Sequence, residues 1–200
     1  YAGIGHPLVA EADVETVPIQ LLAGMEELEY RKDMDGVEYL RRSLSVSQGD
    51  ITLVTIGPLT NVGVLLCKYP EVKGKIKEIV MMGGAYYMHY NEWNILCDPE
   101  AAHIVYSSGV PIRAIGLDVT TRCQVNDQLV TMFRNSKKPE VELLADLLTC
   151  YYENRGRHTF LHDPMAVFAV YDKDIITYQG EDIHVELHGC LLYTSDAADE

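Results

Sequence analysis

Three apolar runs along the chain predict buried β-strands. They span Ile51–Ile56, Ile76–Met82 and Ile112–Val119, and within them apolar residues follow one another instead of alternating with polar ones. The first run stops at Gly57-Pro58 and the second at Gly83-Gly84, which are turn signals. Continuous apolar strands are typical of parallel sheets that are buried on both faces.

Helical patterns separate these strands. The predicted helices are Val37–Leu44 opened by Asp33/Asp35, Leu59–Lys68, a helix starting at Asp98-Pro99-Glu100, Glu140–Asn154, and Met165–Tyr171 opened by Asp163-Pro164. Short strands are expected at Ile175–Tyr178 and Ile183–Leu187. Alternating strands and helices predict an α/β fold: an open, mostly parallel sheet with helices on both faces.

Charge and composition exclude several classes of protein. Sixteen Lys and Arg against thirty Asp and Glu give a net charge of −14, with no basic cluster, which argues against a nucleic-acid partner. No apolar run reaches the roughly 18 residues of a membrane span, so no membrane partner is expected. The five cysteines form no C-x-x-C pair, which favours reduced thiols and a cytoplasmic location.

Both ends of the chain are unusual. The opening Tyr1-Ala2-Gly3-Ile4-Gly5 is typical of the middle of a domain, and we expect an internal fragment of a longer protein. Cys190–Glu200 matches one reading frame of a transposon-end adapter used to prepare sequencing libraries. We therefore expect one domain over residues 1–189, lacking its N-terminal strand, and an artefact over residues 190–200.

Ligands of parallel α/β sheets bind at the carboxyl ends of the strands, so the loops after Ile56, Met82 and Val119 are the first candidates. The loop after Met82 leads to Glu92 and Asn94. In an extended segment these two side chains would point the same way and present an acceptor beside an amide, which suits the hydroxyls of a sugar. By composition alone, a tyrosine-rich surface loop is the commoner explanation.

A second candidate is His162-Asp163-Pro164. Asp-Pro is most often a helix cap. A histidine beside a carboxylate at a strand-to-helix junction also suits a proton donor next to a metal ligand. Neither signal is specific alone.

Taken in order, five segments resemble the nucleoside hydrolase family of the inosine-uridine preferring type, whose members cut the N-glycosidic bond of ribonucleosides. The segments are Ile51–Leu66, Ile79–Ala85, Glu92–Val105, Gly109–Thr120 and His162–Val170. The resemblance covers nearly all of residues 1–189. It implies a Rossmann-like fold and an N-ribosyl hydrolase of the EC 3.2.2 type, which releases free base and ribose from a nucleoside substrate.

The resemblance also implies a calcium ion at the base of the site. Its ligands here would include the backbone carbonyl of Ile56 and the carboxylate of Asp163, and His162 would help to protonate the departing base. Such a reaction passes through an oxocarbenium-like state, which acidic residues stabilise. A hard cation can position and activate the attacking water.

The same resemblance assigns ribose contacts. Glu92 and Asn94 correspond to the family's Glu-Phe-Asn motif, with Trp93 in place of Phe. The family's further ribose-binding Asn normally lies several residues upstream. The loop is shorter here, and Asn91, directly before Glu92, is the candidate for that role.

One family motif is absent. The family opens with Asp-x-Asp-x-Gly-x-Asp-Asp, which supplies further calcium ligands and the general base. The nearest run here, Asp33-Met34-Asp35-Gly36, fits a solvated helix start better. We therefore expect the parent protein to be a hydrolase and this chain alone to be inactive.

Two alternatives remain open, a non-catalytic ribose- or nucleoside-binding α/β module and a purely structural domain in which His162-Asp163-Pro164 only caps a helix. The resemblance further implies nucleobase salvage and a homodimer or homotetramer. It does not fix the preference for purines or pyrimidines. Tyr151, Tyr152 and Arg155 are candidate base contacts.

Overall fold

The computed structural model describes residues 1–11, 29–187 and 192–194, the last three by their backbone only. The chain divides into two compact units. The larger comprises Tyr1–Ala12, Tyr30–Val119 and His162–Glu200, and the smaller comprises Asp13–Glu29 and Thr120–Leu161. The residues proposed from the sequence for catalysis, ribose binding and metal binding belong to the larger unit, and the candidate base contacts Tyr151, Tyr152 and Arg155 belong to the smaller one.

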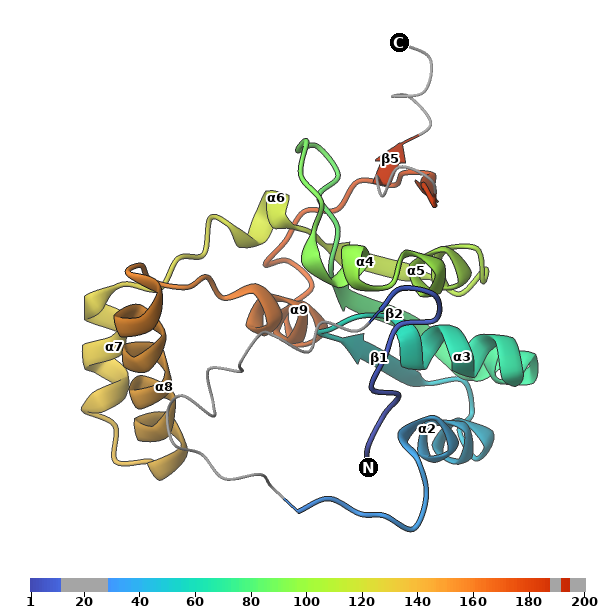
Figure 1. Ribbon diagram of the computed structural model, residues 1–200, viewed down its shortest axis with the longest axis horizontal. Helices are drawn as coiled ribbons and strands as arrows, with labels where there is room; N and C mark the ends of the chain where they lie inside the picture. The colour runs from blue at the N-terminus through green and yellow to red at the C-terminus, as the bar shows by residue number, and fades with distance from the viewer. Residues whose placement is uncertain (12–28, 188–191, 195–200) are drawn as a thin grey trace. The chain divides into compact units, whose positions relative to one another are not determined.

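A parallel sheet of three strands organises the larger unit (Figure 1). Its strands are β1 (Ile51–Thr55), β2 (Ile76–Met82) and β3 (Ile112–Ile115), in the order β1-β2-β3. Both pairings are parallel. Because helices flank this sheet, the predicted α/β class is confirmed.

Successive residues of β2 face opposite sides of the sheet. Ile79 and Met81 join a core cluster formed with α3 (Thr60–Lys68) and α5 (Pro99–Tyr106). Another helix, α9 (His162–Tyr171), packs against β2 and also touches β1 and β3. Its register on the sheet is fixed by Arg113 of β3, which is paired with Glu78 and donates to the carbonyl of Ala169 at 2.8 Å.

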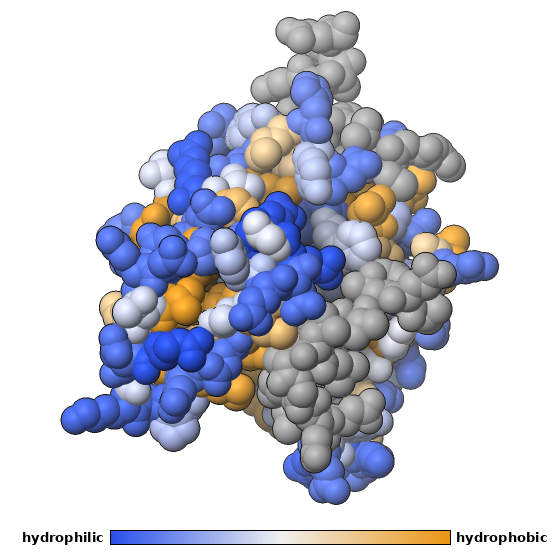
Figure 2. Space-filling model, turned by 60° about the vertical axis from the view of Figure 1, so that its left-hand side comes forward, coloured by the Kyte–Doolittle hydropathy of each residue, from blue (hydrophilic) through white to orange (hydrophobic). Residues whose placement is uncertain are grey.

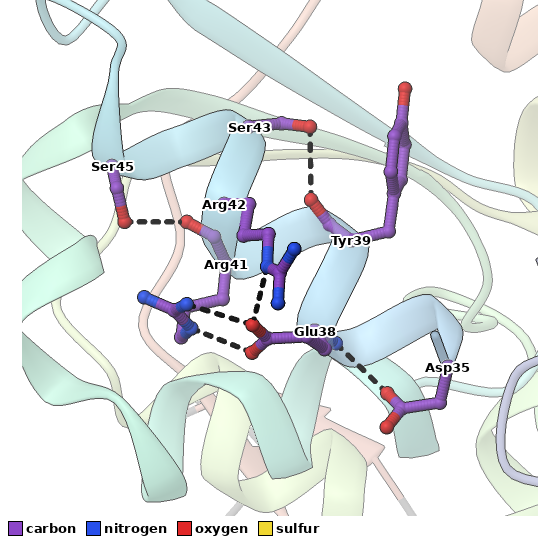
Figure 3. A network of polar contacts seen from close by, with 7 residues as sticks. All are labelled: Asp35, Glu38, Tyr39, Arg41, Arg42, Ser43 and Ser45. Atoms are coloured by element: carbon purple, nitrogen blue, oxygen red, sulfur yellow. Dashed lines mark hydrogen bonds and ion pairs between the residues drawn. The ribbon is translucent and has the colours of Figure 1, made fainter. Parts of the chain in front are cut away.

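Helix α2 (Gly36–Ser45) begins where the sequence predicts (Figure 3). Asp35 accepts a hydrogen bond from the amide of Glu38 at 2.8 Å and is the N-cap. Arg41 and Arg42 both bind the Glu38 carboxylate, and their hydrogen bonds lower the pKa of Glu38 to about 2. The interpretation of the Asp33–Gly36 run as a solvated helix start is confirmed.

Asp98 is a buried carboxylate that joins three segments. It is fully buried and caps α5 by accepting from the amide of Ala101 at 3.0 Å. It also accepts from the amide of Leu8 at 3.0 Å and from the hydroxyl of Thr60 at 2.5 Å. These bonds compensate its loss of water and tie the N-terminal segment to the starts of α3 and α5.

The remaining elements of the larger unit include a 3-10 helix η1 (Pro70–Lys75), which leads into β2. A short strand, β4 (Ile183–Val185), pairs antiparallel with β5 (Leu192–Thr194). The latter lies within residues 190–200, the part that the sequence analysis set aside.

Two strand predictions are wrong. The third strand ends at Ile115, not at Val119, because the chain turns at Gly116 into the short helix α6 (Leu117–Thr120). Ile175–Tyr178 forms no strand. Its side chains pack without strand pairing: Ile176 is buried, and the Tyr178 ring lies 5.5 Å from the Arg113 guanidinium carbon.

In the smaller unit, α7 (Asp127–Arg134) packs against α8 (Pro139–Arg155). Asn126 caps α7, and α8 ends at Gly156, whose φ of 66° lies in the left-handed region. This is a common way for a helix to stop.

The face drawn in Figure 2 is mostly hydrophilic, with hydrophobic residues in patches between the hydrophilic ones. No helix among the described residues is long and apolar enough to span a membrane. The four cysteines in the described residues, Cys67, Cys97, Cys123 and Cys150, are not joined in disulfides. Cys190 lies outside those residues.

We predict that Asp98→Ala lowers the free energy of unfolding by about 2–4 kcal/mol, because three donors lose their acceptor in a buried place. Asp35→Ala is the matched control and should cost about 1 kcal/mol, since this exposed cap accepts one bond. Urea unfolding followed by circular dichroism measures both. Equal losses for the two variants would contradict the role given to Asp98.

Candidate functional site

Glu92 is a buried acid at the start of α4 (Trp93–Cys97). Only 5% of Glu92 is exposed. Its carboxylate accepts from the amides of Asn94 at 3.0 Å, Ile95 at 3.1 Å and Gly84 at 3.1 Å. The expectation that Glu92 and Asn94 lie in an extended segment is therefore wrong, because Glu92 is a helix cap and Asn94 lies in the first helical turn.

Asn94 is anchored to the end of β2. Its side-chain amide donates to the carbonyl of Met82 at 3.1 Å, and Met82 is the last residue of that strand. Asn91 is exposed and lies directly before the Glu92 cap. The structure thus holds Glu92 and Asn94 at the carboxyl end of β2, whereas Asn91 lies on the surface beside them.

The two glycines that directly follow β2 lie next to the Glu92 carboxylate. The Gly84 N–H is bonded to Glu92, and a Cβ on Gly83 would lie 3.4 Å from a carboxylate oxygen of Glu92. Gly84 has a φ of 87°, a conformation that glycine adopts most readily.

His162 and Asp163 are the first two residues of α9. Both are half-buried. The helix begins at His162, so the prediction that Asp163 caps it from outside is wrong. Asp163 lies instead within the first turn, where the positive end of the helix dipole favours a carboxylate.

The charge of Glu92 acts on both His162 and Asp163. Burial raises the pKa of Asp163, the charge of His162 opposes this, and the charge of Glu92 adds to it. Burial lowers the pKa of His162, against the opposite influence of Asp163 and Glu92. These two acids and the histidine therefore influence one another's charge.

The candidate metal ligands are of the type that an oxygen-ligated cation takes, but they are few. The Asp163 carboxylate and the Ile56 carbonyl are hard oxygen ligands, and Ile56 directly follows β1. One residue earlier, the hydroxyl of Thr55 is buried and lacks a hydrogen-bond partner. Within the described ranges, however, no group of three or more His, Cys, Asp or Glu side chains could hold a metal ion. The type of donor fits calcium, but the number does not.

The candidate base contacts lie elsewhere. Tyr151, Tyr152 and Arg155 all belong to α8 in the smaller unit. The ring of Tyr152 lies 4.7 Å from that of His158, with which it packs. Their role as base contacts stays a prediction.

Sequence reasoning missed Asp118. Its carboxylate binds two backbone amides of the loop that follows β2. The only signal was its place in the Gly-Leu-Asp-Val-Thr run after the third strand, where no partner could be recognised.

The profile of the family "Inosine-uridine preferring nucleoside hydrolase" matches residues 1–197. This chain therefore belongs to that family.

Among similar proteins is the pyrimidine-specific ribonucleoside hydrolase RihA of Shewanella woodyi, with 36% identity over 78% of this chain and 53% of the relative. The probable uridine nucleosidase 1 of Oryza sativa subsp. japonica is 33% identical over 78% of this chain and 52% of its own length. The chain thus spans about half the length of these curated relatives.

A solved structure, the purine-preferring ribonucleoside hydrolase from Gardnerella vaginalis, superposes with a TM-score of 0.85 at 28% identity. The match covers 98% of this chain and 70% of the other. A plant nucleoside hydrolase gives a TM-score of 0.84 at 25% identity, over 97% and 67% of the two chains.

We predict that Gly84→Ala destabilises the protein more than Gly109→Ala. Both glycines have positive φ, so each alanine should cost about 1–2 kcal/mol for the backbone alone. A Cβ at Gly84 would also lie 2.6 Å from the Tyr86 ring, whereas nothing lies within 4 Å of one at Gly109. Displacing that ring should add about 1–3 kcal/mol in urea unfolding. Equal costs would contradict the packing described.

Proposed function

We propose that the protein to which this chain belongs hydrolyses the N-glycosidic bond of ribonucleosides to free base and ribose. The observation that carries the proposal is that this chain belongs to the nucleoside hydrolase family, and the charge of Glu92, which acts on both His162 and Asp163, supports it. Two carboxylates suit a reaction whose transition state carries positive charge on the sugar.

Glu92 and Asn94 are proposed to hold the ribose. A carboxylate has about four acceptor sites, and three backbone amides already use the Glu92 oxygens. About one site is left for a sugar hydroxyl, in a direction that those amides fix. Asn94 would bind a second hydroxyl through its amide oxygen, since its nitrogen is engaged by Met82. Asn91 would close the site from the surface.

His162 is proposed to assist departure of the base. Burial favours its neutral form, and the charges of Asp163 and Glu92 oppose that effect. Those same acids would stabilise the imidazolium form from which His162 would donate its proton to the departing base, leaving a neutral imidazole.

Calcium dependence is part of the proposal. Asp163 and the carbonyl of Ile56 would supply two of the roughly six to eight oxygens that calcium takes, and the others would come from the rest of the longer protein. When bound, such an ion lowers the pKa of a water molecule.

The range of candidate bases is taken from the names of the similar proteins. The names of the similar proteins include pyrimidine-specific, uridine-cleaving and purine-preferring enzymes, so both classes of base are candidates. We propose that the protein acts in nucleobase salvage in the cytoplasm as a homodimer or homotetramer.

A non-catalytic nucleoside-binding module is the second candidate. The shortage of metal donors in the described residues favours it for this chain alone. Turnover by the longer protein distinguishes the two.

We predict that the full-length protein hydrolyses inosine or uridine, with free base and ribose as products. The 200-residue chain alone should be inactive, because it contributes about two calcium ligands. Chelation should abolish turnover, and added calcium should restore it. Chromatography of the products with and without phosphate measures this.

Three outcomes would contradict parts of this account. Formation of ribose 1-phosphate in a phosphate-dependent reaction would make the enzyme a phosphorylase. Binding of nucleoside without turnover would favour the non-catalytic module. Turnover by the isolated chain would show that its own residues suffice.

We predict that Asp163→Ala and His162→Ala fail differently in the full-length enzyme. Asp163→Ala should lose both calcium binding and activity, since it removes a charged ligand. His162→Ala should keep calcium binding and lose about 10²–10⁴-fold of kcat/KM on inosine. It should lose much less on p-nitrophenyl riboside, whose leaving group needs no proton.

Asp172→Ala is the matched control. This exposed carboxylate follows the other end of α9 and, among the described residues, accepts from the amide of Asp174 alone. It should leave both activities unchanged. If His162→Ala loses as much on p-nitrophenyl riboside as on inosine, its role as an acid must be dropped.

A further inference from the structure

The backbone that follows β2 is fastened to the backbone that follows β3. The amide of Gly83 donates to the carbonyl of Ile115 at 3.2 Å, and the amide of Leu117 donates to the carbonyl of Gly84 at 2.9 Å. These bonds extend the strand pairing past the ends of β2 and β3. The segment that bonds Glu92 is thereby held by the β3–α6 junction.

The side chain of Asp118 adds two hydrogen bonds to the same loop. One carboxylate oxygen accepts from the amide of Tyr86 at 2.8 Å, and the other accepts from the amide of Tyr87 at 3.0 Å. Both oxygens thus serve the loop after β2 and satisfy two successive amides. A bond from backbone N–H to a charged carboxylate is stronger than one to a neutral acceptor.

Tyr86 holds the loop from its other side. Its hydroxyl donates to the carbonyl of Gly83 at 3.0 Å and is paired with the hydroxyl of Tyr106 at 2.5 Å. Its ring lies so close to Gly84 and Gly116 that a Cβ on either would approach it within 2.8 Å. Burial raises the pKa of Tyr106 to about 12 and also raises the pKa of Tyr86, so both hydroxyls stay protonated.

Gly84 transmits this restraint to the candidate site. Its carbonyl is held by Leu117, and its N–H donates to Glu92 at 3.1 Å. We propose that Asp118 is a positioning residue for ribose recognition: it fixes the Gly83–Tyr87 segment so that the Gly84 amide holds Glu92 in place. This inference rests on the proposed role of Glu92 in binding a ribose hydroxyl.

The variant Asp118→Asn tests the restraint with little change of shape. Asparagine offers one acceptor oxygen, and its NH₂ group would face the second backbone amide. One of the two bonds to Tyr86 and Tyr87 is lost. Asp35→Asn is the matched control, because asparagine caps a helix as well as aspartate does.

The experiment measures kcat/KM of the full-length protein on a ribonucleoside and on its 2′-deoxy and 3′-deoxy counterparts. Asp118→Asn should lose about 10–100-fold on the ribonucleoside, because displacement of a positioned group costs this much. It should lose clearly less on at least one deoxy counterpart. The ratio of kcat/KM on the ribonucleoside to kcat/KM on that deoxy counterpart therefore falls. In a Glu92→Gln background, Asp118→Asn should cause little further loss of that ratio.

A general loss of folded protein would lower activity on every substrate alike and leave the ratio unchanged. An unchanged ratio, or losses that multiply in the double variant, would therefore overturn the inference. Tyr86→Phe gives a second test if Asp118→Asn does not fold. It keeps the ring, releases the carbonyl of Gly83, and should lower the same ratio.

Failure of the proposed function is detected separately. If the wild-type protein has no hydrolase activity, amide hydrogen exchange of Gly84 measured by NMR still tests the structural restraint. Exchange should be at least about tenfold faster in Asp118→Asn than in wild type, and unchanged in Asp35→Asn. Equal exchange at Gly84 in all three proteins would overturn the inference.

Discussion

The buried carboxylate of Glu92 is the constraint on which the candidate site depends. A charge that is 95% removed from water is costly unless polar partners replace its hydration, and three backbone amides do so here. Two of these amides begin α4 and the third follows β2. Satisfying this one acid therefore fixes the end of the central strand, the start of the next helix and the direction in which the acid faces.

Much of the framework is predictable because its signals are local. The run Ile76–Met82 forms a strand with the predicted bounds. A short continuous apolar stretch between turn signals favours a buried strand. Asp98-Pro99 starts a helix as expected, because a capping carboxylate and a proline act within one turn. Helix α8 likewise differs from its predicted bounds by one residue at each end.

The geometry of the site was less predictable because its contacts are distant in sequence. The partners of Glu92 include an amide eight residues earlier, and Asp118 binds amides about thirty residues earlier. The two-residue spacing of Glu92 and Asn94 was interpreted as part of an extended segment, whereas Glu92 caps a helix that contains Asn94. Likewise, the run at Ile175–Tyr178 buries only Ile176, and its Tyr178 ring packs beside Arg113, so these side chains pack without a strand partner.

The central claim is that Glu92, with His162 and Asp163 nearby, forms the ribose site of a nucleoside hydrolase. A crystal structure of the full-length protein with ribose bound tests it most directly. The account predicts one sugar hydroxyl within hydrogen-bond distance of Glu92, another near Asn94, and the anomeric carbon on the side of His162. Ribose bound away from Glu92, or Glu92 turned out of its three amides to reach the sugar, would contradict it.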